Sequence, residues 1–258
     1  MMFQTITTNY YHYYKIFAQS DIIDLYEGSV SWIIPCEGKK GPSLAFRVRL
    51  KEESAETELR TFIQGIREGK VPQMWIITPD AAPDNIIDIM KRNGFKDLSA
   101  DASEPEPAMS LYKNDFIPYT EENSPIVCRK ISTKEDFKSW IDVVNTALHG
   151  WEMIDAEHYF TWVESDHINI YSAEIKGVAV STCATIQNGT AASFEFVSTL
   201  EQYRRKKAAS LLCSRAINDL LKNGAEIVTL SACGQSVPLY ERLGFKKCFN
   251  NIIMKYDF

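Results

Sequence analysis

A short run of basic residues, 204–207 (RRKK), lies directly before two small residues, Ala208 and Ala209. The apolar periodicity that starts there predicts a helix over residues 208–222, ended by Asn223-Gly224. A helix N-terminus offers unpaired N–H groups and the positive end of the helix dipole, and small residues let a phosphate approach the backbone closely. The pattern therefore indicates a pyrophosphate site. Basic loops also occur on solvated faces that bind nothing, and charge alone does not separate these alternatives.

The segments around this loop alternate between strand and helix patterns. Thr133 or Ser132 can cap a helix whose first turn carries two acids, and Lys176-Gly177 is a tight hairpin signal. The resulting order is β-α-α-β-β-β-α-β-α-β, with strands expected at 126–131, 169–175, 178–186, 191–199, 226–231 and 249–256 and helices at 133–148, 156–163, 208–222 and 238–243.

The run that begins at Val197 resembles the acetyl-CoA-binding motif of the GNAT acetyltransferases, [Q/R]-x-x-G-x-[G/A] preceded by V-x-T-x-x-x-[Y/F]. Val197, Thr199 and Tyr203 match the preceding part, and residues 204–209 (RRKKAA) match the core. The family's second mark, L-Y-x-x-L-G-F, is matched by residues 239–245 (LYERLGF). The resemblance covers the second half of the chain. It implies an α/β GNAT fold with a mixed sheet, acetyl-CoA as acetyl donor, and no metal.

The resemblance also implies which residues hold the cofactor. Backbone groups of Val197 and Thr199 would polarise the thioester carbonyl, and N–H groups from residue 205 onward would hold the pyrophosphate. The family's central glycine is Lys207 here, which a lysine accommodates if its φ stays negative and its side chain points outward. The expected cofactor-binding set is Val197, Ser198, Thr199, Arg204, Arg205, Lys206, Lys207, Ala208, Ala209 and Gln235.

Two residues are candidates for proton transfer. Tyr240 matches the family's tyrosine near the sulfur and would protonate the departing thiolate, although a tyrosine that only packs against the sheet is the alternative. Glu195 is the candidate base, because strand alternation puts it on the face of Val197 and Thr199 and its aromatic neighbours would raise its pKa. An ordinary surface carboxylate is the alternative for Glu195.

His149 and Trp151 lie between the first two predicted helices of this half, where GNAT folds border the acceptor pocket. An aromatic wall beside a titratable group suits a cationic or aromatic amine, although a Gly-Trp pair in a loop also packs down on the core.

An acidic, proline-rich stretch between residues 98 and 120 divides the chain, so we expect domains at 1–118 and 119–258. The first half shares one pattern with the second: a strand, a proline-containing loop, a short helix and Gly-Phe-Lys, at residues 74–96 and 227–246. The echo suggests two tandem GNAT-like domains with a degenerate first copy. Strands at 44–50, 74–78 and 109–113 and helices at 55–67 and 84–92 are expected there.

The composition of the chain limits the classes of partner and the compartment that we expect. The net charge of −6 offers no basic surface for nucleic acid, and no segment resembles a signal peptide or a membrane span. The cysteines form no C-x-x-C pair, and Cys183 and Cys213 lie in apolar runs typical of buried free thiols. We therefore expect a cytoplasmic protein; a homodimer is left open.

Three functions remain in view. The first is acetyl transfer to a primary amine of a small molecule or amino-acid-like acceptor, directly within a ternary complex, since no nucleophile elbow or other acyl-enzyme motif is present. The second is a catalytically weak or inactive acyl-CoA-binding scaffold, which Lys207 favours. The third is a protein or peptide N-acetyltransferase whose first half shapes a peptide groove.

Overall fold

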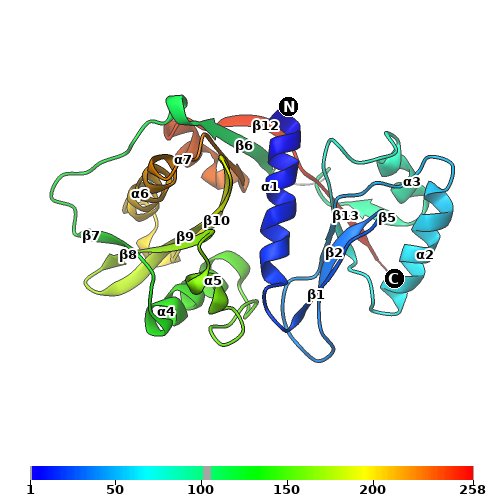
Figure 1. Ribbon diagram of the computed structural model, residues 1–258, viewed down its shortest axis with the longest axis horizontal. Coiled ribbons are helices and arrows are strands. Elements are labelled where there is room, and N and C mark those ends of the chain that lie inside the picture. The colour runs from blue at the N-terminus through cyan, green and yellow to red at the C-terminus, as the bar shows by residue number, and fades with distance from the viewer. Residues whose placement is uncertain (1, 101–105, 258) are drawn as a thin grey trace. The chain divides into compact units, whose positions relative to one another are not determined.

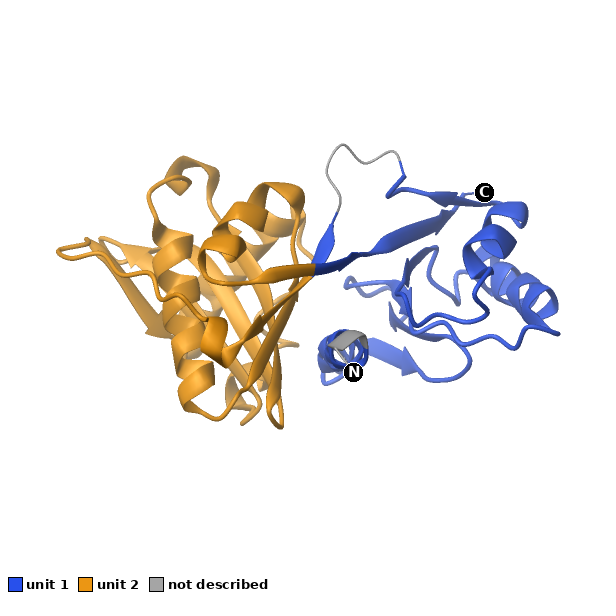
Figure 2. Ribbon diagram, turned by 90° about the horizontal axis from the view of Figure 1, so that it is seen from above, with its two compact units in different colours: residues 1–108, 248–258 blue, residues 109–247 orange. Residues whose placement is uncertain are grey.

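The computed structural model describes residues 2–100 and 106–257 and separates the chain into two compact units (Figure 2). Unit 1 comprises Met1–Ala108 with Cys248–Phe258, and unit 2 comprises Met109–Lys247. The sequence led us to expect a single boundary between residues 118 and 119. In the structure the chain leaves unit 1 after Ala108 and returns to it at Cys248. The returning segment is a strand that unit 1 uses to complete its sheet.

Unit 2 follows the predicted element order. Its sheet has the strand order β12-β6-β11-β10-β9-β8-β7, and Figure 1 shows α6 on one side of the central strands with α4 and α5 on the other. The second predicted helix, 156–163, is reduced to one turn, α5. The elements are β6 (Pro107–Tyr112), β7 (Ile126–Lys130), α4 (Lys134–Val144), a π-helix (Asn145–His149), α5 (Thr161–Glu164), β8 (Ile168–Ile175), β9 (Val178–Asn188), β10 (Ala191–Thr199), α6 (Ala208–Lys222), β11 (Ile227–Ser231), α7 (Val237–Arg242) and β12 (Lys246–Asn250), with 3-10 turns at Lys113–Asp115, Glu201–Tyr203 and Gly234–Ser236.

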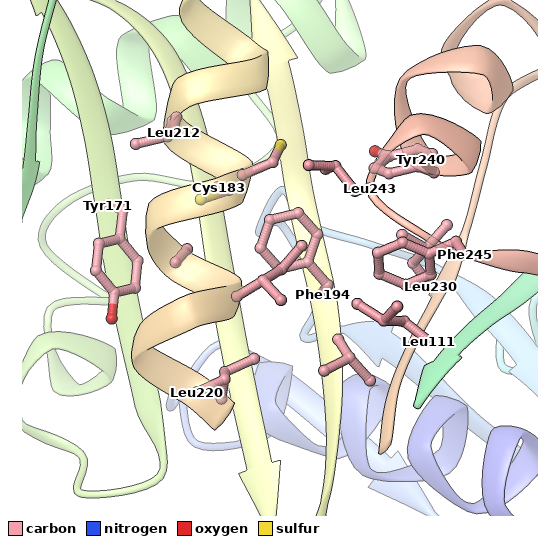
Figure 3. Packing of buried hydrophobic residues seen from close by; sticks show 14 of the residues in the cluster. Leu111, Tyr171, Cys183, Phe194, Leu212, Leu220, Leu230, Tyr240, Leu243 and Phe245 are labelled. Atoms are coloured by element: carbon pink, nitrogen blue, oxygen red, sulfur yellow. The ribbon is translucent and has the colours of Figure 1, made fainter. Parts of the chain in front are cut away.

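Local chemistry explains several of these boundaries. The Thr133 hydroxyl accepts a hydrogen bond from the Asp136 N–H at 3.2 Å, which caps α4 as the sequence predicts. Lys176 and Gly177 both have positive φ and join β8 to β9 in a tight hairpin. The packing of α6 on the sheet forms the core in Figure 3, where Leu212 and Leu220 of the helix lie near Phe194 of β10.

The parallel pair β10 and β11 forms a fork. Its register runs from Ala191↔Ile227 to Ser193↔Thr229, and β10 continues to Thr199 beside β9 alone. Between Glu195 and Ser198 the register with β9 shifts, since three steps on β10 correspond to two on β9. Phe196 has φ 54 at this bulge. A bulge bends the strand, and here it coincides with the separation of β10 from β11.

Unit 1 has a six-stranded sheet in the order β1-β2-β3-β4-β13-β5. Its helices α2 and α3 bury one apolar face each, with Leu59, Ile63 and Ile89 among the core residues. The strand expected at 44–50 is short because Arg47 leaves the extended conformation with φ 53. The elements are α1 (Met2–Phe17), β1 (Ile23–Tyr26), β2 (Ser31–Pro35), β3 (Leu44–Phe46), α2 (Ala55–Arg67), β4 (Met74–Ile77), α3 (Ile86–Arg92), β5 (Phe95–Asp97) and β13 (Ile252–Tyr256).

The single strand predicted at 249–256 is wrong. The chain breaks at Asn251 into β12, which belongs to the sheet of unit 2, and β13, which pairs antiparallel with β4 and β5. Asn251 is buried, its N–H donates to the Glu106 carbonyl at 3.1 Å, and its side-chain amide contacts the Tyr10 hydroxyl at 3.4 Å. These bonds to residues outside either sheet ladder interrupt the strand at that residue.

The two Gly-Phe pairs occupy equivalent backbone positions. Gly94 after α3 and Gly244 after α7 have φ 97 and φ 99, a region that side chains disfavour. A Cβ on Gly244 would lie 2.0 Å from the Asp115 carbonyl oxygen, so no larger residue fits there. Both glycines end a short helix and turn the chain into a strand, which supports the shared pattern of the two halves.

Candidate functional site

A cleft of about 460 Å³ lies in unit 2 at the open end of the β10/β11 fork. The bulged end of β10, the basic loop and the first turn of α6 form one wall, and the turn before α7 forms another. Nine of the ten residues expected at the cofactor contribute to it: Val197, Ser198, Thr199, Arg204, Arg205, Lys207, Ala208, Ala209 and Gln235. Lys206 is the one that does not line the cleft; its ammonium lies 5.0 Å from the centre of the Tyr203 ring.

The basic loop has an unusual backbone. Arg205 has φ 61, and Lys207, the N-cap of α6, has φ 68 and ψ 4. The expectation that Lys207 keeps a negative φ is therefore wrong. The backbone retains the left-handed conformation that a glycine would adopt freely, and the lysine bears a cost of about 1–2 kcal/mol for it.

Lys207 does point outward, as expected. Its ammonium pairs with Glu121 at 2.8 Å. Hydrogen bonds to Glu121 and to Tyr119 raise the pKa of Lys207. The segment before β7 thus holds the lysine side chain, while the backbone of the lysine faces the cleft.

The charge of the cleft suits a polyanion. Three arginine side chains line it, Arg204, Arg205 and Arg242, while Lys207 contributes its backbone, and no carboxylate occurs among its described lining residues. The side chain of Lys207, the N-cap of α6, makes no capping hydrogen bond, and the first turn of the helix contains no acidic residue. The N–H groups of this turn and the helix dipole are therefore available to an anion.

Glu195 lies at the bulge of β10. Its Oε1 atom is buried and lacks a hydrogen-bond partner among the described residues. Burial raises the pKa of Glu195 well above its usual range, as its aromatic neighbours predicted. A buried, unpartnered carboxyl oxygen is costly for a fold, so it marks Glu195 as a candidate for chemistry.

The prediction that strand alternation puts Glu195 on the same face of β10 as Val197 is wrong. Phe194 belongs to the core under α6, and Val197 packs against that same core three residues later. Phe196 instead contacts Trp140 and Trp162 of α4 and α5, with ring centres 5.4 Å and 5.5 Å apart. The bulge inserts one residue and interrupts the two-residue period.

Tyr240 lies in the core rather than on the cleft surface. Its side chain is 4% exposed, and its ring meets Phe245 edge-on at 5.7 Å (Figure 3). Burial raises the pKa of Tyr240 well above its usual range, with smaller contributions from neighbours that include Glu195, while a hydrogen bond with Ser236 opposes the shift. Ser236 itself lines the cleft, so Tyr240 lies directly behind the cleft wall.

The segment after α4 lines the cofactor cleft through other residues than the two that the sequence predicted for the acceptor pocket. His149 ends the π-helix, and its Nε2 atom is buried without a hydrogen-bond partner in the described part of the chain. Burial lowers the pKa of His149. Trp151 is 49% exposed, and neither residue lines the cofactor cleft. Ala147 and Leu148 line it instead.

Sequence reasoning missed several lining residues. Leu239 and Arg242 follow from helical spacing, since they are three residues apart on α7, on a different face from Tyr240. Tyr203 belongs to the loop motif and Ser210 to the first turn of α6, so both were within reach of the same signal. No comparable signal identifies the residues at the π-helix and beside the 3-10 turn before α7, because these elements have no sequence pattern of their own. The missed residues are Ala147, Leu148, Tyr203, Ser210, Cys233, Ser236, Leu239 and Arg242.

Other classes of site find no support within residues 2–100 and 106–257. No cluster of three His, Cys, Asp or Glu side chains there could hold a metal ion. None of the helices described is both long and apolar enough to cross a bilayer. Cys183 and Cys213 are buried free thiols, as their apolar surroundings predicted.

Residues 129–255 match the family model of the acetyltransferase (GNAT) domain, and this part of the chain belongs to the GNAT family. The matched residues contain the fork, the basic loop and α6. A comparison with proteins of curated function finds no relative that matches this sequence.

Solved structures share the fold along nearly the whole chain. A GCN5-related N-acetyltransferase from Kribbella flavida has a TM-score of 0.74 and 15% identity, covering 98% of this chain and 95% of its own. One from Sphaerobacter thermophilus has a TM-score of 0.64 and 15% identity, covering 87% and 79%. A tandem GNAT protein from the clavulanic acid biosynthesis pathway has a TM-score of 0.61 and 11% identity, covering 91% and 83%. The GNAT fold thus extends over both units.

Proposed function

We propose that unit 2 is an acetyl-CoA-dependent N-acetyltransferase that acts on a primary amine of a small molecule or amino-acid-like acceptor. The observation that carries the proposal is the cleft at the fork. Its lining joins three arginine side chains to the N-terminus of α6 and includes no carboxylate among the described residues. A ligand that carries a pyrophosphate on a narrow arm fits this combination.

The described residues fit this cofactor. The first turn of α6, opened by Ala208 and Ala209, would hold the pyrophosphate through its N–H groups, with Arg204 and Arg205 adding charge. The end of β10, free of β11 after Ser193, would pair with the pantetheine arm. When bound, the cofactor supplies an acetyl group activated as a thioester.

Two residues near the fork would transfer the protons of the reaction. An amine attacks only when neutral, so Glu195 would take the proton that the acceptor's ammonium loses. Burial raises the pKa of Glu195 and so favours its neutral carboxyl, and an ammonium beside it would favour ionisation. Tyr240 stays protonated because its pKa is raised, so its hydroxyl would give a proton to the sulfur as the C–N bond forms and the C–S bond breaks.

A binding module without turnover is the second candidate. The observation that favours it is Lys207 in the family's glycine position, held by Glu121 and Tyr119. In that reading the loop would keep its shape but the chemistry would be lost. The two candidates differ in turnover and not in cofactor binding.

A thermal-shift titration with acetyl-CoA tests the cofactor, with free CoA and ATP as controls. A ligand that binds only the folded state at ~100-fold excess over its Kd adds about 2.7 kcal/mol of stability. A shift with acetyl-CoA and CoA that exceeds the shift with ATP supports the site. No shift at millimolar acetyl-CoA contradicts it.

Turnover is then measured by mass spectrometry of products from a panel of primary amines, small and amino-acid-like, with a peptide that carries a free N-terminus and a lysine as comparison. Acetylated small amines support the enzyme. Cofactor binding with no acetylated amine at any acceptor would favour the binding module, and preferred acetylation of the peptide would contradict the assigned acceptor class.

A further inference from the structure

Unit 1 contains a second fork with its own cavity. The parallel strands β3 and β4 share the register pair Ala45↔Trp75, and beyond it Arg47 turns away with φ 53. A cavity of about 120 Å³ lies there. It is lined by α1 on one side and by the ends of β3 and β4 on the other, through residues Thr7, Thr8, Tyr10, Tyr11, Tyr14, Phe46, Arg47, Arg49, Ile76, Thr78 and Asp80.

One wall of this cavity is apolar and well packed. The Phe46 ring lies 4.7 Å from the ring of Tyr14 and 5.6 Å from that of Tyr11, centre to centre. Tyr11 and Tyr14 are three residues apart and therefore lie on one face of α1. Ile76 of β4 adds an aliphatic surface. A flat or branched hydrocarbon group could pack closely against these side chains.

The opposite wall is basic. The Arg49 guanidinium pairs with Asp80, which also accepts a hydrogen bond from the Thr78 hydroxyl at 2.7 Å. These bonds, led by Thr78 and Arg49, outweigh burial and lower the pKa of Asp80, so this carboxylate is charged and already engaged. The lining therefore holds one cation in excess.

That cation is Arg47. Arg47 is an exposed residue whose guanidinium lies 5.2 Å from the centre of the Tyr11 ring and forms no ion pair or hydrogen bond with a described residue. The Arg47 charge contributes to lowering the pKa of Glu27, but Glu27 accepts its hydrogen bonds from Lys15 at 2.7 Å and from the Tyr11 hydroxyl. A guanidinium presents a planar fork of donors that matches a carboxylate.

The cavity is too small and too differently charged to repeat the cofactor cleft. Its volume of about 120 Å³ compares with about 460 Å³ in unit 2. An engineered cavity of about 150 Å³ holds benzene, so the space here fits a body of roughly six carbon atoms. The helix that follows this fork, α2, carries Glu56 and Glu58 in its first turn, where a phosphate would be repelled.

We propose that the fork of unit 1 binds a small monocarboxylate with a flat or branched apolar body. The carboxylate pairs with Arg47, and the body lies against the wall that Phe46, Tyr14 and Ile76 form. This site is separate from the cofactor cleft and does not depend on the activity proposed for unit 2.

Calorimetric titration of the full chain with benzoate tests the site, with benzamide as a neutral molecule of the same shape. Benzoate should bind saturably at one site per chain, and benzamide should bind at least about tenfold more weakly, because the charge-assisted bond to Arg47 is lost. Arg47→Gln should weaken benzoate by a similar factor. Arg60→Gln, which removes an exposed arginine of α2 that does not line the cavity, should leave benzoate binding unchanged.

Acetyl-CoA binding and the melting temperature of Arg47→Gln, measured in parallel, report whether that variant is folded. A second variant, Tyr14→Ala, removes part of the apolar wall and should also weaken benzoate. The proposal is overturned by three results: no saturable benzoate binding up to about 10 mM, equal affinity for benzamide, or unchanged benzoate affinity in a folded Arg47→Gln. None of these results bears on acetyl-CoA in unit 2, so failure here and failure of the acetyltransferase proposal are distinguishable.

Discussion

The two forks of this chain have similar backbones but differ in the charges at the helix that follows each fork. Each follows a parallel strand pair, and each bends at a residue with positive φ, Arg47 at 53 and Phe196 at 54. The connection to the next helix reads KEES at residues 51–54 in unit 1 and RRKK at residues 204–207 in unit 2. Two acids open α2 and none opens α6. The shape of a fork is therefore not enough for a cofactor site; the charge at the helix N-terminus decides what binds.

Ala209→Glu is the change with the largest expected effect. It puts a carboxylate at the first turn of α6, so acetyl-CoA affinity should fall by at least about 100-fold, which calorimetry measures. Thr57→Glu, at the exposed first turn of α2, is the matched control and should leave the affinity unchanged. Equal losses in both variants, or no loss in Ala209→Glu, would remove the distinction between the forks.

Glu195→Gln removes the proposed base. Turnover should fall about 1,000-fold, with acetyl-CoA affinity preserved. In the wild type, kcat/KM should rise with pH as Glu195 ionises through its raised pKa, and this rise should be absent from the variant. Glu201→Gln, in an exposed turn, is the control. A variant that retains the wild-type pH profile would assign the proton to another group.

The same substitution has a predicted effect on stability. The folded state holds the Glu195 proton more tightly than the unfolded state, whose glutamate pKa is about 4.3. The wild type therefore loses stability as the pH rises from there through the raised pKa, and glutamine does not. Chemical unfolding at pH 8 should find Glu195→Gln more stable by about 1 kcal/mol, with the difference vanishing near pH 4. A less stable variant at pH 8 would mean that the carboxylate has a partner.

Tyr240→Phe should lower kcat about 100-fold and leave the Kd for acetyl-CoA unchanged, because the hydroxyl acts when the sulfur departs. Tyr171→Phe removes another buried hydroxyl of the same core and should leave kcat unchanged. Stopped assays measure kcat for both variants with the same amine acceptor. Parallel loss of kcat and of cofactor affinity in Tyr240→Phe would make Tyr240 a packing residue.

Lys207→Gly should have the smallest effect. Glycine relieves the positive φ but makes the unfolded chain more flexible, so the free energy of unfolding should change by less than about 1 kcal/mol. Acetyl-CoA affinity should change less than about threefold, since the backbone keeps its shape. Lys176→Gly, at φ 52 in a hairpin far from the cleft residues in sequence, reports the backbone effect alone. A tenfold gain in affinity in Lys207→Gly would show that the lysine obstructs the site.

The sequence predicts unit 2 far better than unit 1. Helix α6 and strand β10 have the predicted bounds, because a strong apolar period and clear turn residues mark their ends. Helix α1 was not expected, since its tyrosines and threonines are weak helix formers and packing against other residues of unit 1 stabilises it. The return of β13 to the first sheet also leaves no local signal, because β13 pairs with strands more than 150 residues away.

The site shows the same division. The cofactor residues next to the loop motif line the cleft, since neighbours in sequence share one loop and one helix turn. The bulge at Phe196 and the left-handed Lys207 were not predicted, because tertiary contacts and not residue type impose those conformations. Arg47 at the fork of unit 1 lies in no motif, and only the fold brings it to Tyr11 and Phe46.

The stoichiometry of acetyl-CoA binding to the full chain tests the difference between the two forks most directly. Calorimetry should find one site per chain, filled in the wild type and in Thr57→Glu and lost in Ala209→Glu. Two sites per chain, or one site that survives Ala209→Glu, would contradict the assignment of the cofactor to the fork of unit 2.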